Sequence, residues 1–263
     1  MSLAERLLRR VPEVAILLAA GHGTRLKPYT DIVPKPLLIY SGRPVIDYIF
    51  DALEKTLIRP VIIVTNYLEE RLISHINENF SQRFTLRFCH QKETLGSANA
   101  LSSTRAAARK YTSTGRPLLI SATDYPMPTD YLLELSRFHE SHDADISVSL
   151  RKISAAKAPH GSRIVESDGE LLRIVEKPED QADGPIIAAS LIYIVPPAVF
   201  DYADKCPRSK RGEFELPEVI NMMIDRGFRA KGFLQQDLID LDLALHHPSQ
   251  KCAGHCYPPE DLH

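Results

Sequence analysis

Residues 14–36 read VAILLAAGHGTRLKPYTDIVPKP, and this stretch decides the fold. Its uninterrupted apolar run, 14–20, predicts a short strand buried on both faces, which Gly21 ends. A glycine-rich turn after the first strand is where open α/β sheets bind phosphates, because backbone N–H groups can approach anionic oxygens where no Cβ intervenes. Arg25 and Lys35 add two positive charges to the same loop. The stretch therefore predicts an α/β sheet with a phosphate-binding loop after its first strand.

Strand-like and helix-like segments alternate through the first 150 residues. The expected strands that follow the first one are 61–64, 85–89, 118–121 and 145–150, and the expected helices are 44–55, 68–79, 98–110 and 131–141. This order predicts a doubly wound, mostly parallel mixed sheet with right-handed crossovers, a Rossmann-like arrangement.

The pattern changes after residue 151. The turn sequence Ser-Asp-Gly-Glu at 167–170 separates two apolar runs and predicts a β-hairpin. Beyond it we expect a strand at 186–195, a helix at 216–226 that ends at Gly227, and a last strand near 238–241. The chain has no linker-like stretch, so we expect one domain over 1–245 and an irregular tail over 246–263.

The composition excludes several classes of protein. A formal net charge of −2 over 263 residues argues against a nucleic-acid-binding face. No apolar run approaches the roughly 20 residues of a membrane span. The four cysteines, at positions 89, 206, 252 and 256, match no standard zinc pattern, and we expect reduced thiols in the cytoplasm. The oligomeric state, a homo-oligomer included, and metal binding by the Cys/His-containing tail stay open.

The loop after the first strand belongs to neither of two common phosphate-binding motifs. It has no Gly-Lys-Ser/Thr, and Leu26 stands at the third glycine position of G-x-G-x-x-G. The whole string resembles the signature of the sugar-1-phosphate nucleotidyltransferases: a strand, then G-x-G-T-R-L-x-P-x-T, then P-K-P-L-L. The resemblance is to the core domain of this family only. Three later elements continue the resemblance in order: Gln91 with Leu-Gly-Ser-Ala at 95–98, Asp124, and Glu-Lys-Pro at 176–178.

The resemblance implies a role for each matched residue. The nucleotide-binding residues would be Ala20, Gly21, Gly23, Thr24, Gln91 and Gly96, with Gln91 reading the base and Gly96 allowing flat contact with its ring. The catalytic residues would be Arg25, Lys35 and Lys177. The sugar-phosphate-binding residues would be Gly161, Glu176, Lys177 and Glu215. Residues 1–150 would then form the nucleotide-binding half, and 151–245 the sugar-phosphate-binding half.

The resemblance also implies Mg²⁺ as the cofactor. Its ligands would be Asp124, just past a central strand, and Asp240, in the late element Ile-Asp-Leu-Asp at 239–242. Asp242 is the competing choice for the second ligand. A carboxylate pair of this kind suits a hard cation that bridges phosphates.

The expected reaction joins a nucleoside triphosphate to a sugar 1-phosphate with release of pyrophosphate. Glucose 1-phosphate with dTTP or UTP is the leading pair, and mannose 1-phosphate with GTP is the alternative. Departures from the family pattern at Thr123, His160, Ser190 and Pro217 raise an unusual sugar phosphate as a further alternative. From other classes, the alternatives are a non-catalytic regulatory subunit that binds nucleotide sugar and a glycosyltransferase. A regulatory subunit of this kind tends to lose the arginine, a lysine or a metal-binding aspartate, whereas this chain retains Arg25, Lys35, Asp124, Lys177 and Asp240. A glycosyltransferase would need an Asp-x-Asp metal motif after a mid-chain strand.

Overall fold

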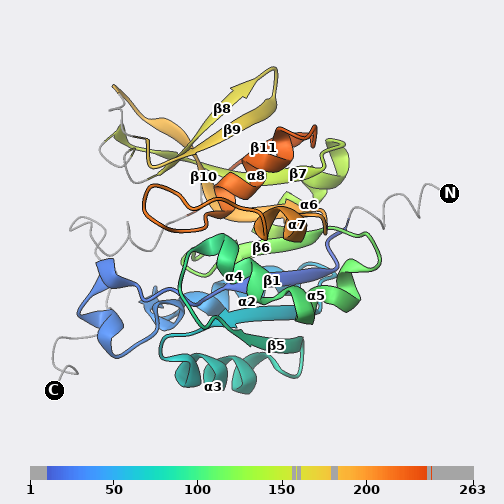
Figure 1. The fold of residues 1–263 in the computed structure, drawn as a ribbon. Helices are drawn as coiled ribbons and strands as arrows, with labels where there is room; N and C mark the ends of the chain where they lie inside the picture. Colours follow the sequence, from blue (N-terminus) through green and yellow to red (C-terminus); the bar gives the residue numbers. More distant parts are fainter. Residues whose placement is uncertain (1–10, 156–157, 159–160, 179–182, 236–237, 239–263) are drawn as a thin grey trace.

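A nine-stranded mixed sheet forms the centre of the computed structural model, which describes residues 11–155, 158, 161–178, 183–235 and 238. Seven strands follow the order β11-β7-β10-β6-β1-β4-β5 (Figure 1). Their bounds are β1 Val14–Leu18, β4 Pro60–Thr65, β5 Thr85–His90, β6 Leu118–Ala122, β7 Ile146–Ile153, β10 Ile186–Val195 and β11 Ala230–Leu234. All neighbouring pairs along this order are parallel except those of β10, which runs antiparallel to β6 and β7. The mostly parallel mixed sheet is thus confirmed.

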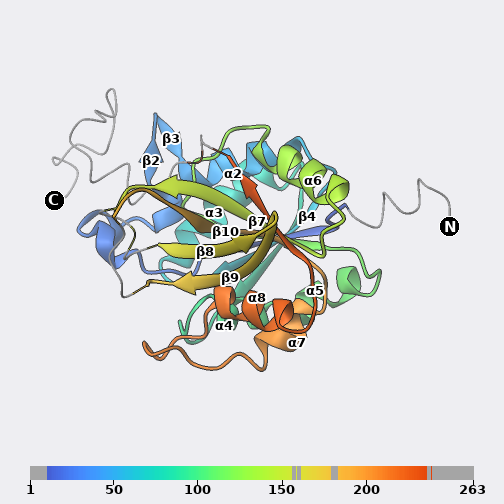
Figure 2. The same ribbon diagram turned by 90° about the horizontal axis from the view of Figure 1, so that it is seen from above.

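Helices cover both faces of this sheet, as the doubly wound prediction required. Along β1, Val14 and Ile16 join one buried cluster while Ala15 and Leu17 join the other, because successive side chains of a strand point to opposite faces. Figure 2 shows α2 and α6 on one side, and α4, α7 and α8 on the other. The helices are α2 Val45–Glu54, α3 Glu69–Phe80, α4 Ser97–Ser103, α5 Arg105–Thr112, α6 Tyr131–Ser141, α7 Val199–Ala203 and α8 Leu216–Ile224. Among the described residues, none of these helices has the length and apolar character to cross a membrane.

The predicted hairpin is formed by β8 Ser162–Ser167 and β9 Glu170–Glu176. Asp168 and Gly169 both have positive φ, 53° and 74°, which is the requirement of a two-residue turn that matches strand twist. β8 also pairs with β10, so the hairpin joins the main sheet. The buried side chain of Asn221 in α8 closes the free edge of β9: it accepts a hydrogen bond from Ile174 N at 2.8 Å and donates one to Ile174 O at 2.9 Å.

One expectation about the elements was wrong in detail, and two elements were missed. The single helix expected over 98–110 is divided at Thr104 into α4 and α5, where the Thr104 hydroxyl donates to Leu101 O at 2.7 Å. The sequence pattern also failed to indicate β11 and the five-residue α7. The strand expected near 238–241 lies outside the described residues apart from Leu238, as do the tail and its cysteines. Cys89 and Cys206 are free thiols.

Three short elements complete the path between β1 and α2. They are the 3₁₀ turns η1 Thr24–Leu26, η2 Tyr29–Asp31 and η3 Lys35–Leu37. A small two-stranded ribbon, β2 Ile39–Tyr40 with β3 Arg43–Pro44, follows them. Because β1, β4, β5 and β6 are parallel, the loops that follow them all leave from one edge of the sheet, where the candidate site is built.

Candidate active site

The loop after β1 begins with a left-handed turn at Gly23. Its φ is +64°, and a Cβ there would lie 2.8 Å from Thr30 Cγ2. The Thr30 hydroxyl donates to Gly23 O at 2.9 Å, and Leu26 N donates to the same oxygen at 2.8 Å. Glycine is therefore needed here for both backbone conformation and space.

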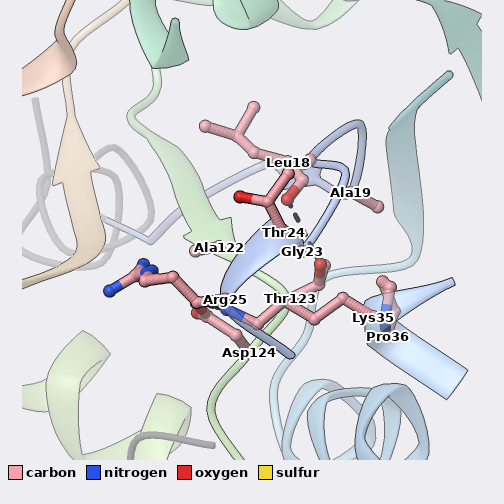
Figure 3. Close-up of a pocket in the computed structure, with 11 residues that line it drawn as sticks. Leu18, Ala19, Gly23, Thr24, Arg25, Lys35, Pro36, Ala122, Thr123 and Asp124 are labelled. Atoms are coloured by element: carbon pink, nitrogen blue, oxygen red, sulfur yellow. Dashed lines mark hydrogen bonds and ion pairs between the residues drawn. The ribbon is translucent and has the colours of Figure 1, made fainter. Parts of the chain in front are cut away.

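This loop forms one wall of a cavity of about 210 Å³. Figure 3 shows its lining, which comes from the end of β1, the loop after it, η3 and the end of β6. The cavity brings together six residues that the sequence singled out: Gly21, Gly23, Thr24, Arg25, Lys35 and Asp124. Ala20, although adjacent to this lining, is buried and lines neither this cavity nor the next.

An ion pair joins Lys35 to Asp124 across the floor of the cavity. Lys35 Nζ lies 2.8 Å from Asp124 Oδ2, and both side chains are largely buried. Burial by itself would raise the pKa of Asp124, but attraction to the Lys35 ammonium and its hydrogen bond, with the Arg151 guanidinium nearby, hold that pKa below its ordinary value. Asp124 Oδ1 is buried and receives no hydrogen bond within the described part of the chain. Asp124 thus carries an ionised carboxylate, one of whose oxygens has no hydrogen-bond partner among the described residues.

A second cavity, of about 500 Å³, continues from the first. The two share Gly21, Thr24, Arg25, Ala122 and Asp124 in their linings. On the far side, the second cavity is lined by all four residues predicted to bind the sugar phosphate: Gly161, Glu176, Lys177 and Glu215. The predicted catalytic cations Arg25 and Lys177 therefore border one continuous space.

Carboxylates surround Arg211 in this second cavity. Arg211 hydrogen-bonds Glu215, and its Nη2 lies 3.7 Å from Glu176 Oε1 and 3.9 Å from Glu213 Oε2. Ser162 Oγ donates to Glu176. Burial raises the pKa of Glu176, the Ser162 hydrogen bond opposes that rise, and the charge of Glu215 adds to it.

Lys177 has an unusual backbone in this wall. Its φ is +45°, a left-handed value that costs a non-glycine residue free energy, and its N–H donates to Gly161 O at 2.9 Å. Its side chain is exposed. The hairpin thus presents Lys177 to solvent in a held conformation, with Gly161 beside it.

The predicted base-reading residues, Gln91 and Gly96, line neither cavity. Gln91 is only 4% exposed, and its Nε2 donates to Asn99 Oδ1 at 2.7 Å and to Gly96 O at 3.3 Å. Gly96 has φ +107°, and a Cβ there would lie 2.4 Å from Phe214 O. The backbone of Phe214 alone thus requires glycine at this position, a reason that the sequence did not offer. Contact of Gln91 and Gly96 with a base stays a prediction.

Some expected residues fall outside the described part of the chain. These are the second metal ligand Asp240, its competitor Asp242, and His160. Among the residues that the structure does describe, no group of three or more His, Cys, Asp or Glu side chains is arranged to hold a metal ion. Asp124 is the predicted metal ligand that the structure describes, and its carboxylate, with one oxygen that receives no hydrogen bond, has the chemistry that suits a hard cation.

Sequence reasoning missed three polar residues of this region. Arg151 and Arg211 line the second cavity, and the guanidinium of Arg151 lies 5.4 Å from the ring centre of Tyr125. Asn99 holds the amide of Gln91. Arg151 sits in a strand and Asn99 in a helix, so no local pattern marked them. Arg211 stands one residue before the Gly-Glu-Phe-Glu-Leu-Pro stretch at 212–217, and that proximity was the available signal.

Comparison with known proteins agrees with this geometry. The family model described as Nucleotidyl transferase matches residues 14–242. The chain is 27% identical over 214 residues to the UTP–glucose-1-phosphate uridylyltransferase AglF of Haloferax volcanii, covering 81% of this chain and 84% of that protein. It is 31% identical over 255 residues to mannose-1-phosphate guanyltransferase beta-B of Xenopus laevis, covering 91% of this chain and 68% of that protein. The chain spans 53% of the length of some other guanylyltransferases, such as the mannose-1-phosphate guanylyltransferase catalytic subunit beta of Xenopus tropicalis.

A solved structure shares the fold. The crystal structure of UDP-glucose pyrophosphorylase complexed with UDP-glucose superposes with a TM-score of 0.74 at 20% identity, covering 88% of this chain and 94% of that one. The family model spans most of the chain, and the curated relatives are sugar-1-phosphate nucleotidyltransferases. The chain therefore belongs to the nucleotidyl transferase family.

Proposed function

We propose that this protein transfers the nucleotidyl group of a nucleoside triphosphate to a sugar 1-phosphate and releases pyrophosphate. The observation that carries the proposal is the continuous cavity that Arg25 and the β1 loop share with Glu176, Lys177 and Glu215. We further propose glucose 1-phosphate with UTP or dTTP as the substrates, with mannose 1-phosphate and GTP as the alternative. The uridylyl- and guanylyltransferases among the relatives support these two pairs.

The residues suit a reaction between two anions. A phosphate oxygen of the sugar phosphate would attack the α-phosphorus, and the bond from that phosphorus to the bridging oxygen of pyrophosphate would break. Repulsion between the substrates must be offset, which is the role proposed for Arg25 and Lys35 on the nucleotide and Lys177 on the sugar phosphate. Because no protein nucleophile is required, we expect sequential kinetics with no covalent intermediate.

We propose Mg²⁺ as the cofactor, with Asp124 as one ligand. The lowered pKa of this carboxyl group and the absence of a hydrogen bond to its Oδ1 support the proposal, since a ligand for a hard cation must be an ionised oxygen that is not committed to another partner. Asp240 is proposed as the second ligand. When bound, the ion would supply positive charge to the phosphate oxygens.

The proposed location is the cytoplasm. The two cysteines whose structure is described are free thiols, which suits a reducing compartment. Localisation of a tagged chain in its source cells, by fractionation with markers for each compartment, tests this proposal. Recovery outside the cytoplasmic fraction would contradict it.

The decisive test is pyrophosphate release with Mg²⁺ over a grid of nucleoside triphosphates and sugar 1-phosphates. We expect one pair to dominate and Arg25→Ala to lower the rate by at least about 100-fold, because removal of a transition-state donor costs about that much. Arg83→Ala is the matched control, since Arg83 lines neither cavity and pairs with Glu54 at 2.7 Å elsewhere on the surface. Absence of release from every pair would refute the proposed reaction, and full activity in Arg25→Ala would refute the role proposed for Arg25.

A further inference from the structure

The backbone of Gln91 is fixed at the carboxyl end of β5. Its N–H donates to Thr65 O at 2.9 Å, and Asn66 Nδ2 donates to its carbonyl oxygen at 2.7 Å. Its side chain is held between the turn at Gly96 and helix α4. Little freedom is therefore left to this side chain in choosing which polar atom it offers to a ligand.

The surroundings of the Gln91 amide determine which way round it sits. A backbone carbonyl can only accept a hydrogen bond, so the atom 3.3 Å from Gly96 O must be the amide nitrogen. Asn99 Oδ1, at 2.7 Å, accepts the other hydrogen of the same nitrogen. An amide nitrogen has two hydrogens, and both are committed. Oε1 is then the polar atom that Gln91 has left for a ligand, and it can only accept.

The partners that hold this amide are themselves braced by the segment before α8. Phe214 N donates to Leu95 O at 2.7 Å, and Ala98 N donates to Phe214 O at 2.9 Å. Leu216 N donates to Ser97 Oγ at 2.8 Å. These bonds fix the turn that carries the Gly96 carbonyl and the start of the helix that carries Asn99. The orientation of the Gln91 amide is thus built into the fold.

We propose that Asn99 is a positioning residue that sets base selection by holding Gln91 as a hydrogen-bond acceptor. This inference rests on the proposed function and on the expectation, implied by the family resemblance, that Gln91 reads the base. Uracil and thymine carry a ring N–H at N3, and guanine carries one at N1, whereas adenine and cytosine have a bare acceptor nitrogen at the corresponding place. For a base held in the same position, a bare nitrogen facing Oε1 loses a hydrogen bond and adds repulsion, and the neighbouring amino group of adenine or cytosine can donate to Oε1 only if the base shifts. The site therefore selects UTP, dTTP or GTP over ATP and CTP.

A ligand-side experiment tests the acceptor role without any variant. Isothermal titration calorimetry with Mg²⁺ gives the Kd of the unmodified chain for UTP, dTTP, GTP, ATP and CTP. It is repeated with 3-methyl-UTP or 1-methyl-GTP, whichever matches the preferred base. We expect the best ring-N–H nucleotide to bind at least about tenfold tighter than ATP, CTP and its own methylated analogue. ATP or CTP binding as tightly, or an analogue equal to its parent, would overturn the inference.

Two substitutions test Asn99 itself. Asn99→Leu removes the acceptor at similar volume, whereas Asn99→Asp keeps an acceptor oxygen. We expect Asn99→Leu to reduce the nucleotide preference about tenfold with kcat and the sugar-phosphate KM unchanged, and Asn99→Asp to retain it. An unchanged preference in Asn99→Leu contradicts the positioning role. If Asn99→Leu does not fold, Asn99→Ala makes the same comparison.

The binding measurements also separate this inference from the proposed function. They require no turnover, so they can succeed where the pyrophosphate assay fails. A chain that released no pyrophosphate but bound UTP with the expected selectivity, and lost that selectivity in Asn99→Leu, would refute the function and support the role of Asn99. A chain that turned over ATP or CTP best would support the proposed reaction type but refute both the proposed nucleotides and the role of Asn99.

Discussion

Replacement of Gly96 by alanine tests how tightly the turn after β5 is fitted to the rest of the protein. Gly96 has φ +107° and ψ 176°, a region of backbone conformation that is essentially restricted to glycine. An added Cβ would lie 2.4 Å from Phe214 O and 2.9 Å from Phe214 N. These neighbours are backbone atoms, so no side-chain rotation can relieve the overlap.

The cost has two sources. Holding alanine in this conformation costs about 2 kcal/mol, within the range for strained backbone residues. Moving Phe214 away weakens its hydrogen bonds to Leu95 O and from Ala98 N, each worth about 1 kcal/mol. Together they give about 4 kcal/mol, which lowers the Tm of a chain of this size by about 10 °C.

Gly115→Ala provides the matched control. Gly115 also has a positive φ, +73°, but nothing lies within 4 Å of the place that an added Cβ would take, so backbone strain of about 1 kcal/mol is the whole expected cost. Thermal unfolding followed by circular dichroism, with urea titration, gives both values. A loss in Gly96→Ala no larger than that in Gly115→Ala would refute the claim that contact with Phe214 requires the glycine.

The remaining predictions concern buried charges and the hydrogen bonds at the edge of strand β9. Lys35→Met removes the ammonium 2.8 Å from Asp124 and should cost about 2 kcal/mol at pH 7. Since the ion pair lowers the pKa of Asp124, its contribution to stability is complete above the ordinary aspartate pKa and is lost on acidification. The Tm difference between the unmodified chain and Lys35→Met should therefore disappear at low pH. A difference that does not change with pH would contradict stabilisation by the ion pair. Burial raises the pKa of Glu176, so its ionisation disfavours the folded state. The Tm of Glu176→Gln should therefore rise relative to that of the unmodified chain as the pH is raised from about 4 to about 8. A Tm difference that does not grow over this range would contradict a raised pKa of Glu176. Asn221→Leu should cost about 3 kcal/mol in urea unfolding by leaving both backbone groups of Ile174 unpaired, with Asn221→Asp in between; equal stability of the two variants would refute the edge-closing role.

The sequence predicted the first wall of the site well because that wall is local. The strand, the left-handed glycine at position 23, and the cations of one short loop are adjacent in the chain, so a pattern can indicate them. Gly96 was singled out for contact with a base ring, which stays a prediction, whereas the structure shows that glycine is required there by the backbone of Phe214, over a hundred residues later. A glycine in a sequence indicates that a Cβ is disfavoured at that position, but it does not indicate which group would clash with the Cβ.

Residues that act through distant partners escaped prediction for the same reason. Asn99 lies within an expected helix, and its importance comes from a hydrogen bond to Gln91 that only the folded turn creates. β11 was missed because Lys231 and Gly232 interrupt its apolar pattern. Gly232 is explained by Leu150 on the neighbouring strand, whose Cδ1 would lie 2.3 Å from an added Cβ.

The antiparallel strand β10 explains how the two walls come to face each other. By inserting between β6 and β7, it places Ala189, Leu191 and Tyr193 in the lining of the second cavity, beside the end of β6 that carries Asp124. The same strand pairs with β8, and thereby anchors the hairpin that carries Lys177. A reaction between two phosphates needs cations on both sides of the reacting atoms at fixed separation. One sheet supports both loops, and the β10–β8 pairing anchors the loop that carries Lys177. We therefore expect substitutions that loosen this pairing to raise the Kd for the sugar phosphate more than the Kd for the nucleotide.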